Sequence, residues 1–90
     1  MVNRMASIEE VQAGIGVAND HANAAIGAAH QARNDMEVAL SALAHATEGS
    51  PQADVSRAVG LFKQALNGLE EVQAQISGGI SEADAVRGRL

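Results

Sequence analysis

Apolar residues recur with a seven-residue period along two stretches of this chain, and no other feature restricts the possible folds as strongly. If the first stretch is counted in heptads from Ile8 and the second from Val55, every a and d position holds an apolar residue or glycine. The a positions are Ile8, Ile15, Ala22, Ala29, Met36, Leu43, Val55, Phe62, Leu69, Ile76, Ala83 and Leu90. The d positions are Val11, Ala18, Ala25, Ala32, Ala39, Ala46, Ala58, Ala65, Val72, Gly79 and Val86. This period predicts two long α-helices that pack along an a/d seam.

The two stretches are separated by one break, which contains the only proline of the chain. Gly49 suits the left-handed conformation that follows the last turn of a helix. Ser50 followed by Pro51 is typical of a helix start, where the missing N–H of proline costs nothing. A connection this short makes the two helices antiparallel neighbours. At the other end, Ser7 and Glu10 have the spacing of a capping box and predict where the first helix starts.

We therefore predict an all-α fold, a long antiparallel helical hairpin over residues 7–90 that assembles into a four-helix bundle, after a disordered N-terminus at residues 1–6. The first helix covers about 7–47, the corner 48–51 and the second helix about 51–77. Two glycines at 78–79 cost roughly 2 kcal/mol inside a helix, and Ser81 is a possible cap for a new one. Since the heptad phase continues unbroken, we expect a kinked or frayed turn at 78–79. A helical segment at about 81–90 then continues on the same face.

The composition indicates that this hairpin is weak when alone. Alanine makes up 19 of the hydrophobic residues, and Phe62 is the only aromatic residue. A seam with alanine at most d positions buries little area, and small domains are marginal in any case. Five further glycines lie inside the predicted helices, and each costs roughly 1 kcal/mol: Gly14, Gly16, Gly27, Gly60 and Gly68. We therefore expect a protein partner, or a second copy in a homodimer, to cover apolar surface.

A second apolar stripe lies at the e positions, four residues after each a position. Its members are Ile26, Leu40, Val59, Leu66 and Ile80. They widen the apolar face beyond what one neighbouring helix covers. We expect the hairpin to leave them exposed and predict that they bind the partner, because an exposed apolar band marks a contact site. The alternative is that they are scattered exposed apolar residues, which every protein has.

Charge and hydropathy exclude several classes of partner. The formal net charge is −5 and the isoelectric point is near 4.9, whereas nucleic acids and anionic membranes attract basic surfaces. There is no apolar run of the length that spans a bilayer. The N-terminal sequence lacks the apolar core of a signal peptide. We expect a location in the cytoplasm, or export without a cleaved signal peptide.

The sequence also gives no support for catalysis, a metal, a cofactor or a small-molecule substrate. His21, His30 and His45 lack the i, i+3 or i, i+4 spacing of metal ligands on one helix, and there is no cysteine. The acidic pairs Glu9-Glu10 and Glu70-Glu71 are interpreted as solvated helix surface. A pair of catalytic carboxylates needs a pocket between them, for which an alanine-rich seam has no room. We therefore expect that the protein is not an enzyme.

The order of elements resembles a known class of proteins. A capped helix is followed by an acidic Gly-Ser corner (TEGSPQADV), a second helix with LFKQALNGLEEVQ and a short polar tail. This layout resembles the small alanine-rich helical proteins of actinobacteria. These are similar in turn to the lead modules of polymorphic toxins and to the Trp-x-Gly hairpins exported by type VII secretion. The chain carries neither Trp-x-Gly nor a C-terminal Tyr-x-x-x-Asp/Glu motif. The resemblance implies a small helical protein that binds a partner.

Two functions follow from these expectations. In the first, the hairpin is a non-enzymatic adaptor or chaperone-like partner of a larger helical protein, such as a toxin secreted by the type VII pathway. In the second, it is a homo-oligomeric structural bundle with no foreign client. The sequence alone does not decide between them.

Overall fold

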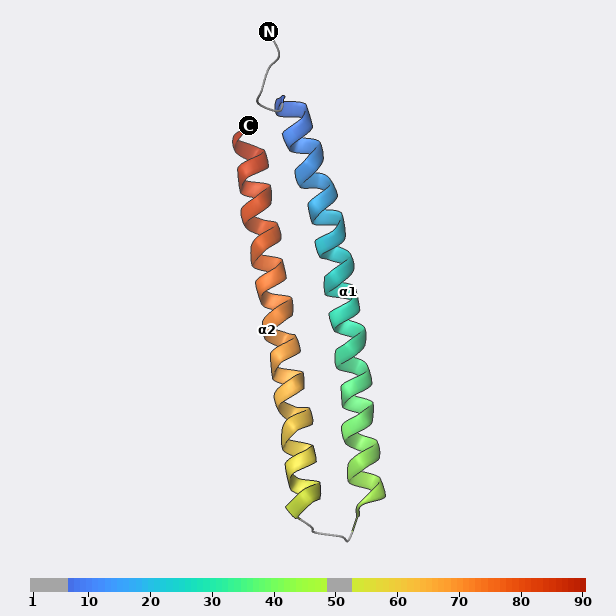
Figure 1. Ribbon diagram of the computed structural model, residues 1–90. Coiled ribbons are helices and arrows are strands. Elements are labelled where there is room, and N and C mark those ends of the chain that lie inside the picture. Colours follow the sequence, from blue (N-terminus) through green and yellow to red (C-terminus); the bar gives the residue numbers. More distant parts are fainter. Residues whose placement is uncertain (1–6, 49–52) are drawn as a thin grey trace.

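The structure is a hairpin of two long antiparallel helices. The computed structural model describes residues 7–48 and 53–90, and its helices are α1 (Ile8–Ala46) and α2 (Ala53–Arg89). They lie side by side over their whole length, with the start of α1 and the end of α2 at the same end of the hairpin (Figure 1). The molecule measures 74 × 21 × 16 Å. The predicted all-α hairpin is confirmed.

Local hydrogen bonds explain where α1 begins and ends. The Glu10 backbone N–H donates to Ser7 Oγ at 3.1 Å, as the capping box predicts. The Ser7 hydroxyl also lies 3.5 Å from the Glu10 carboxylate, to which it donates. At the other end, the Thr47 N–H and hydroxyl donate to the Leu43 carbonyl at 3.0 and 2.7 Å. Of the predicted corner, Gly49, Ser50 and Pro51 lie outside the described residues, as does the N-terminal segment 1–6.

The helix α2 continues through Gly78-Gly79, where the sequence predicted a kinked or frayed turn. Ile76 and Ile80 lie on either side of the two glycines, and both are half-buried against the neighbouring helix. Tertiary packing of this kind supplies most of the stability of helices in proteins and outweighs local propensity. Packing of the apolar face therefore keeps α2 helical at Gly78-Gly79.

The positions that form the seam differ from the predicted ones. All eleven e positions of the described chain are half-buried or buried, as are all a positions except the terminal Ile8 and Leu90. Only four of the eleven d positions are half-buried. The other seven are exposed: Ala18, Ala25, Ala46, Ala65, Val72, Gly79 and Val86. The seam is therefore mainly an a/e seam, and the a/d prediction is wrong over most of the length.

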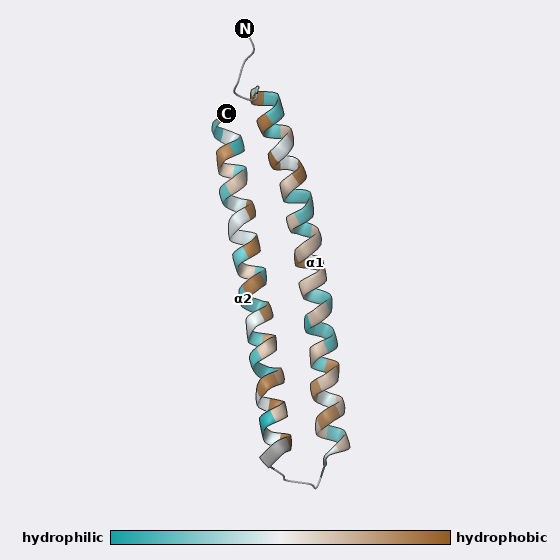
Figure 2. Cartoon of the chain, in the orientation of Figure 1, coloured by the Kyte–Doolittle hydropathy of each residue, from teal (hydrophilic) through white to brown (hydrophobic). Residues whose placement is uncertain are grey.

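The size of the side chains explains this choice. The apolar e positions carry isoleucine, leucine and valine, whereas most d positions carry alanine, and hydrophobic stabilisation grows with the apolar area removed from water. The remaining e positions are polar. Even so, the seam is thin. Within residues 7–48 and 55–90, only Ala29 and Asn19 are buried, each with 8% of its surface exposed. Figure 2 shows apolar residues recurring along both helices, yet the hairpin alone encloses very few of them.

Candidate protein-interaction surface

The d positions of both helices line the same long side of the hairpin. Two antiparallel helices are related by a two-fold axis perpendicular to the plane that contains them both. Rotation about this axis exchanges the helices but leaves the front of the pair in front and the back behind. Equivalent positions of α1 and α2 therefore share a side. Because the seam lies between a and e, the d positions fall together on one side, which we call the alanine flank. Its residues are Val11, Ala18, Ala25, Ala32, Ala39, Ala46, Ala58, Ala65, Val72, Gly79 and Val86.

Two contacts fix the axial alignment of the helices. Asn19 contacts Asp84, and Arg33 contacts Glu70. In antiparallel helices, residues at equal height have residue numbers with a constant sum. The sum is the same for both pairs, so the axial alignment does not change between them. This alignment sets the flank residues of the two helices at nearly equal heights. The neighbours are Ala18 and Val86, Ala25 and Gly79, Ala32 and Val72, Ala39 and Ala65, and Ala46 and Ala58. The flank is thus a continuous strip of small apolar side chains.

The strip is open to solvent. Val72 and Val86 expose 43% and 40% of their surface, and Leu61, at the edge of the strip, exposes 64%. Leu61 belongs to this side because it lies three residues after Ala58 and four before Ala65. Val17 and Val38 are also exposed but lie further round α1, away from the flank.

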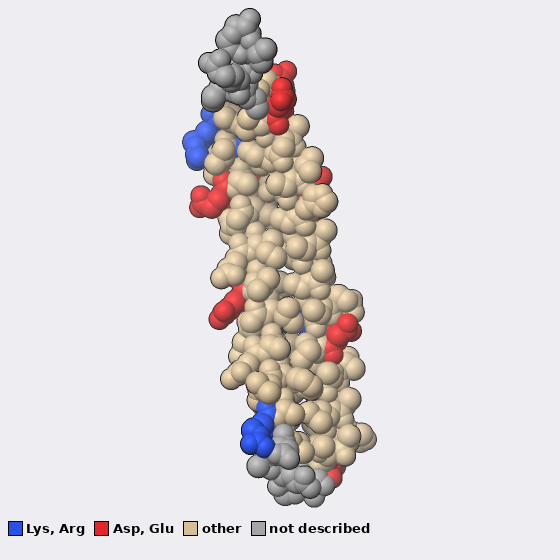
Figure 3. All heavy atoms as spheres, viewed as in Figure 1, with Lys and Arg blue, Asp and Glu red and all other residues tan. Residues whose placement is uncertain are grey.

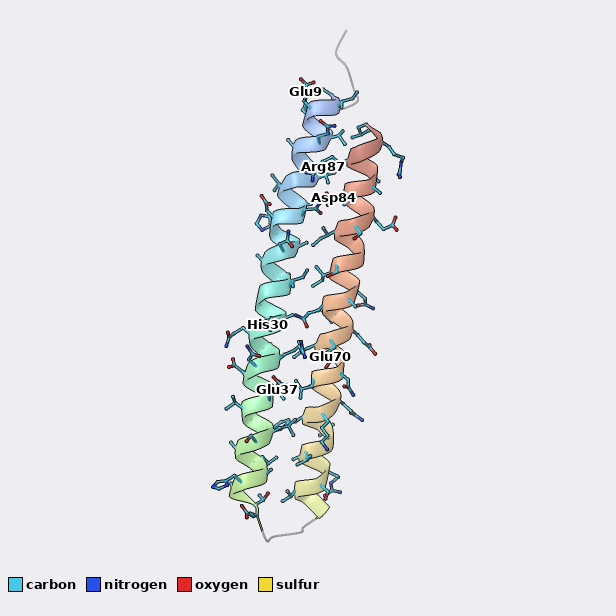
Figure 4. All side chains as sticks on the ribbon, turned by 180° about the vertical axis from the view of Figure 1, so that it is seen from behind. Glu9, His30, Glu37, Glu70, Asp84 and Arg87 are labelled. Atoms are coloured by element: carbon cyan, nitrogen blue, oxygen red, sulfur yellow. The ribbon has the colours of Figure 1, made fainter. Side chains whose placement is uncertain are left out.

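The other side of the seam is polar. Near the open end of the hairpin, Asp84 Oδ1 accepts hydrogen bonds from Asn19 Nδ2 and from Arg87 Nη2, both at 2.8 Å. The Arg87 guanidinium lies over Gly16, where an added Cβ would be 3.4 Å from Nη1. Figure 4 views this side and labels Asp84 and Arg87 along α2. Glycine at position 16 therefore leaves room for the arginine between the helices.

A second polar contact crosses the seam near its middle. Arg33 Nη1 donates to Gln73 Oε1 at 3.3 Å, and Nη2 lies 3.5 Å from Glu70 Oε1. Gln73 Nε2 donates in turn to the Ile26 carbonyl at 3.5 Å. Arg33 Nε is buried without a hydrogen-bond partner. Polar groups inside a helical seam lower stability but fix alignment and orientation.

The two sides therefore differ sharply in chemistry. Figure 3, which views the molecule from the side opposite to Figure 4, shows a surface made mostly of uncharged residues. The charged groups visible there lie mainly along its edges and near its ends. An apolar strip with a polar border is the usual composition of a protein contact surface.

The five residues predicted to bind a partner occupy a different place. Ile26, Leu40, Val59, Leu66 and Ile80 are all half-buried e positions in the seam between α1 and α2. The expectation that the hairpin leaves them exposed is wrong, because they are larger than the alanines at most d positions and offer more apolar area to the seam. Their part in partner binding stays a prediction. Sequence reasoning missed the alanine flank, although the all-apolar d positions were its signal.

The other candidate groups form no chemical site in the part of the chain that the structure describes. His21, His30 and His45 are exposed on α1, and His45 Nδ1 lies 3.6 Å from the Glu48 carboxylate. Glu9, Glu10 and Glu71 are exposed, and Glu70 contacts Arg33. Residues 7–48 and 55–90 hold no cluster of three or more histidine or carboxylate groups suited to a metal. Neither described helix has the apolar length that crossing a membrane requires.

No family model, curated protein or solved structure matches this chain. Its function is therefore inferred from the residues of the hairpin itself.

Proposed function

We propose that the protein is a non-enzymatic protein–protein interaction module whose binding surface is the alanine flank. The observation that supports this proposal is that the d positions are apolar in the sequence but lie mostly outside the seam between α1 and α2. All eleven d positions are apolar or glycine, yet seven of them are exposed. A helix surface that only faces water has no physical reason to exclude every polar residue at one heptad position. A helical partner that covers the flank supplies that reason.

The flank suits a helical partner in particular. Small side chains allow two helix axes to come close together, because the distance between axes depends on the residues at the contact. A straight strip of small residues along both α1 and α2 therefore matches a long helix or a helix pair. Each Å² of apolar surface that the partner covers contributes about 25 cal/mol, before the cost of association is subtracted.

Two kinds of partner fit this surface. As an adaptor, the hairpin would bind a larger helical protein. The resemblance to exported actinobacterial hairpins implies a toxin secreted by the type VII pathway, met in the cytoplasm or after export. As a structural module, the hairpin would bind further copies of itself. The proposed function is common to both, because the same surface serves either partner.

Site-specific photo-crosslinking in the native host tests this proposal. A photoreactive residue replaces Val72 on the flank or, as a matched control, Val38 on the outer side of α1, which is 67% exposed. We expect a discrete protein adduct from position 72 and little from position 38. Equal adducts from both positions, or none from either, would contradict the proposal. The mass of the adduct distinguishes a second copy from a foreign protein.

A further inference from the structure

The alanine flank has the properties of a surface that packs against itself. We propose that two copies of this chain associate through their alanine flanks, with both hairpins pointing in the same direction. The inference rests on the proposed function, because it names the partner of the same surface. A two-fold axis parallel to the helices relates the copies. The result is a four-helix bundle in which α1 of each copy lies antiparallel to α2 of the other.

The exposed area of the hairpin is consistent with a dimer. Its solvent-accessible surface is 6464 Å², whereas a compact monomer of 9.2 kDa exposes about 4,900 Å². The excess of about 1,500 Å² is larger than the roughly 800 Å² that each partner buries in a typical stable interface. The elongated hairpin therefore exposes more surface than one copy needs to bury in such an interface, and an uncharged strip carries no repulsion between the copies at its centre.

The side chains of the flank are complementary to themselves in this arrangement. Because the hairpins point in the same direction, residues at equal height within one hairpin are also at equal height across the two copies. Val86 of one copy then faces Ala18 of the other, and Val72 faces Ala32. Both valines on the α2 part of the flank thus meet an alanine, which favours close packing of facing helices. The contact is the same on both copies, as a two-fold interface requires.

The residues at the edges of the flank favour this orientation over the reverse one. Leu61 and Ala42 lie at equal height, as do Glu82 and His21, and each is three residues after one d position and four before the next. With the hairpins in the same direction, Leu61 meets Ala42 of the other copy and Glu82 meets His21. If one hairpin is reversed about the middle of the flank, Leu61 comes close to Glu82 instead. That contact places an apolar side chain against a carboxylate.

Sedimentation equilibrium of the purified chain tests the dimer. We expect twice the monomer mass of 9.2 kDa at micromolar concentration. We expect V72E/V86E to be monomeric, because its glutamates would lose water in an apolar contact. The matched control V17E/V38E adds the same charge outside the flank and should remain a dimer. Circular dichroism shows whether each variant stays helical. A dimer that V72E/V86E leaves intact would overturn the inference.

Thiol cross-linking tests the orientation without relying on a destabilising variant. The chain has no cysteine, so single cysteines can be placed on separate chains, one of them carrying a mass tag. With a short bis-maleimide, we expect A42C mixed with L61C to cross-link between copies more rapidly than L61C mixed with E82C. The opposite ranking would indicate the reversed dimer and overturn the proposed orientation.

The two proposals can fail separately. If the wild-type chain sediments as a monomer while position 72 still forms an adduct with another protein in the host, the self-association is wrong and the interaction module stands. If the chain is a monomer and position 72 forms no adduct, both are wrong.

Discussion

The two flanks of the hairpin seam have opposite roles, although both border the same a positions. On the polar side, the e positions reach into the seam and bring Asn19, Arg33 and Gln73 into contact with the opposite helix. On the other side, the d positions form the alanine flank, which is apolar throughout and largely exposed. The comparison teaches that an apolar heptad position need not face the nearest helix. Larger side chains occupy that seam, even when polar residues accompany them, and the small apolar residues remain for another contact.

The largest contrast is expected between two leucines of α2. Leu66 is half-buried in the seam, whereas Leu61 is 64% exposed at the edge of the flank. We expect Leu66→Ala to lower the free energy of unfolding by about 2 kcal/mol, the low end for a buried leucine. Leu61→Ala should lower that of the monomer by less than about 0.5 kcal/mol. Urea melts at low concentration measure both. Equal effects would mean that the seam does not lie between the a and e positions.

Larger side chains at two alanines of α1 should also have different effects on stability in the seam and on the alanine flank. Ala29 is buried in the seam, with 8% of its surface exposed. We expect Ala29→Leu to overpack the seam and to cost about 1–3 kcal/mol. Ala25 belongs to the exposed flank, so Ala25→Leu should leave the thermal melt of the monomer nearly unchanged while disturbing the dimer. If Ala25→Leu destabilises the monomer as much as Ala29→Leu does, the result would favour a seam between the a and d positions instead.

The polar side is expected to contribute less than the apolar seam. Asp84→Ala removes the acceptor of Asn19 and Arg87 and leaves the buried Asn19 amide without this partner. We expect a loss of about 1 kcal/mol, mainly from the asparagine, because the exposed ion pair with Arg87 is screened by solvent. Glu82→Ala, two residues away on α2, is the control and should change the free energy of unfolding by less than about 0.5 kcal/mol. Equal losses in chemical denaturation would show that the asparagine contact contributes nothing.

The smallest effect on stability is expected at Arg33. Its Nε is buried without a hydrogen-bond partner, and its charge is only partly compensated by Glu70, which is largely exposed. Removing one partner of an ion pair is costly when it leaves a buried charge behind, but Glu70 is 58% exposed and stays solvated without Arg33. We therefore expect Arg33→Met to change the free energy of unfolding by less than about 1 kcal/mol. Hydrogen exchange should rise near position 33, because the helices can slide more easily. Unchanged exchange would contradict an aligning role for Arg33.

Much of the fold follows from local sequence features. The heptad period predicts two helices, Ser7 and Glu10 predict the start of α1, and the single short break predicts that the helices are antiparallel. Each of these features acts over a few residues and depends little on the rest of the chain. At Gly78-Gly79 the structure differs from the expected kinked or frayed turn, because α2 is one continuous helix there. Helix propensity counts the cost of two glycines, but not the packing of Ile76 and Ile80 that offsets it.

The sequence by itself determined that this chain forms two amphipathic helices of matched length, joined as a hairpin with too little core to be very stable. It did not determine which flank of the a positions the helices share. The heptad pattern distinguishes only apolar from polar residues. All d positions are apolar or glycine, whereas the e positions are mixed, so the pattern favoured a seam between a and d. Only the tertiary structure shows that the seam lies between the a and e positions, because the apolar area buried there depends on the size of the side chains. Polar groups such as Asn19 and Arg33 are tolerated there because the facing helix supplies hydrogen-bond partners. That decision leaves the alanine flank exposed and available for a partner.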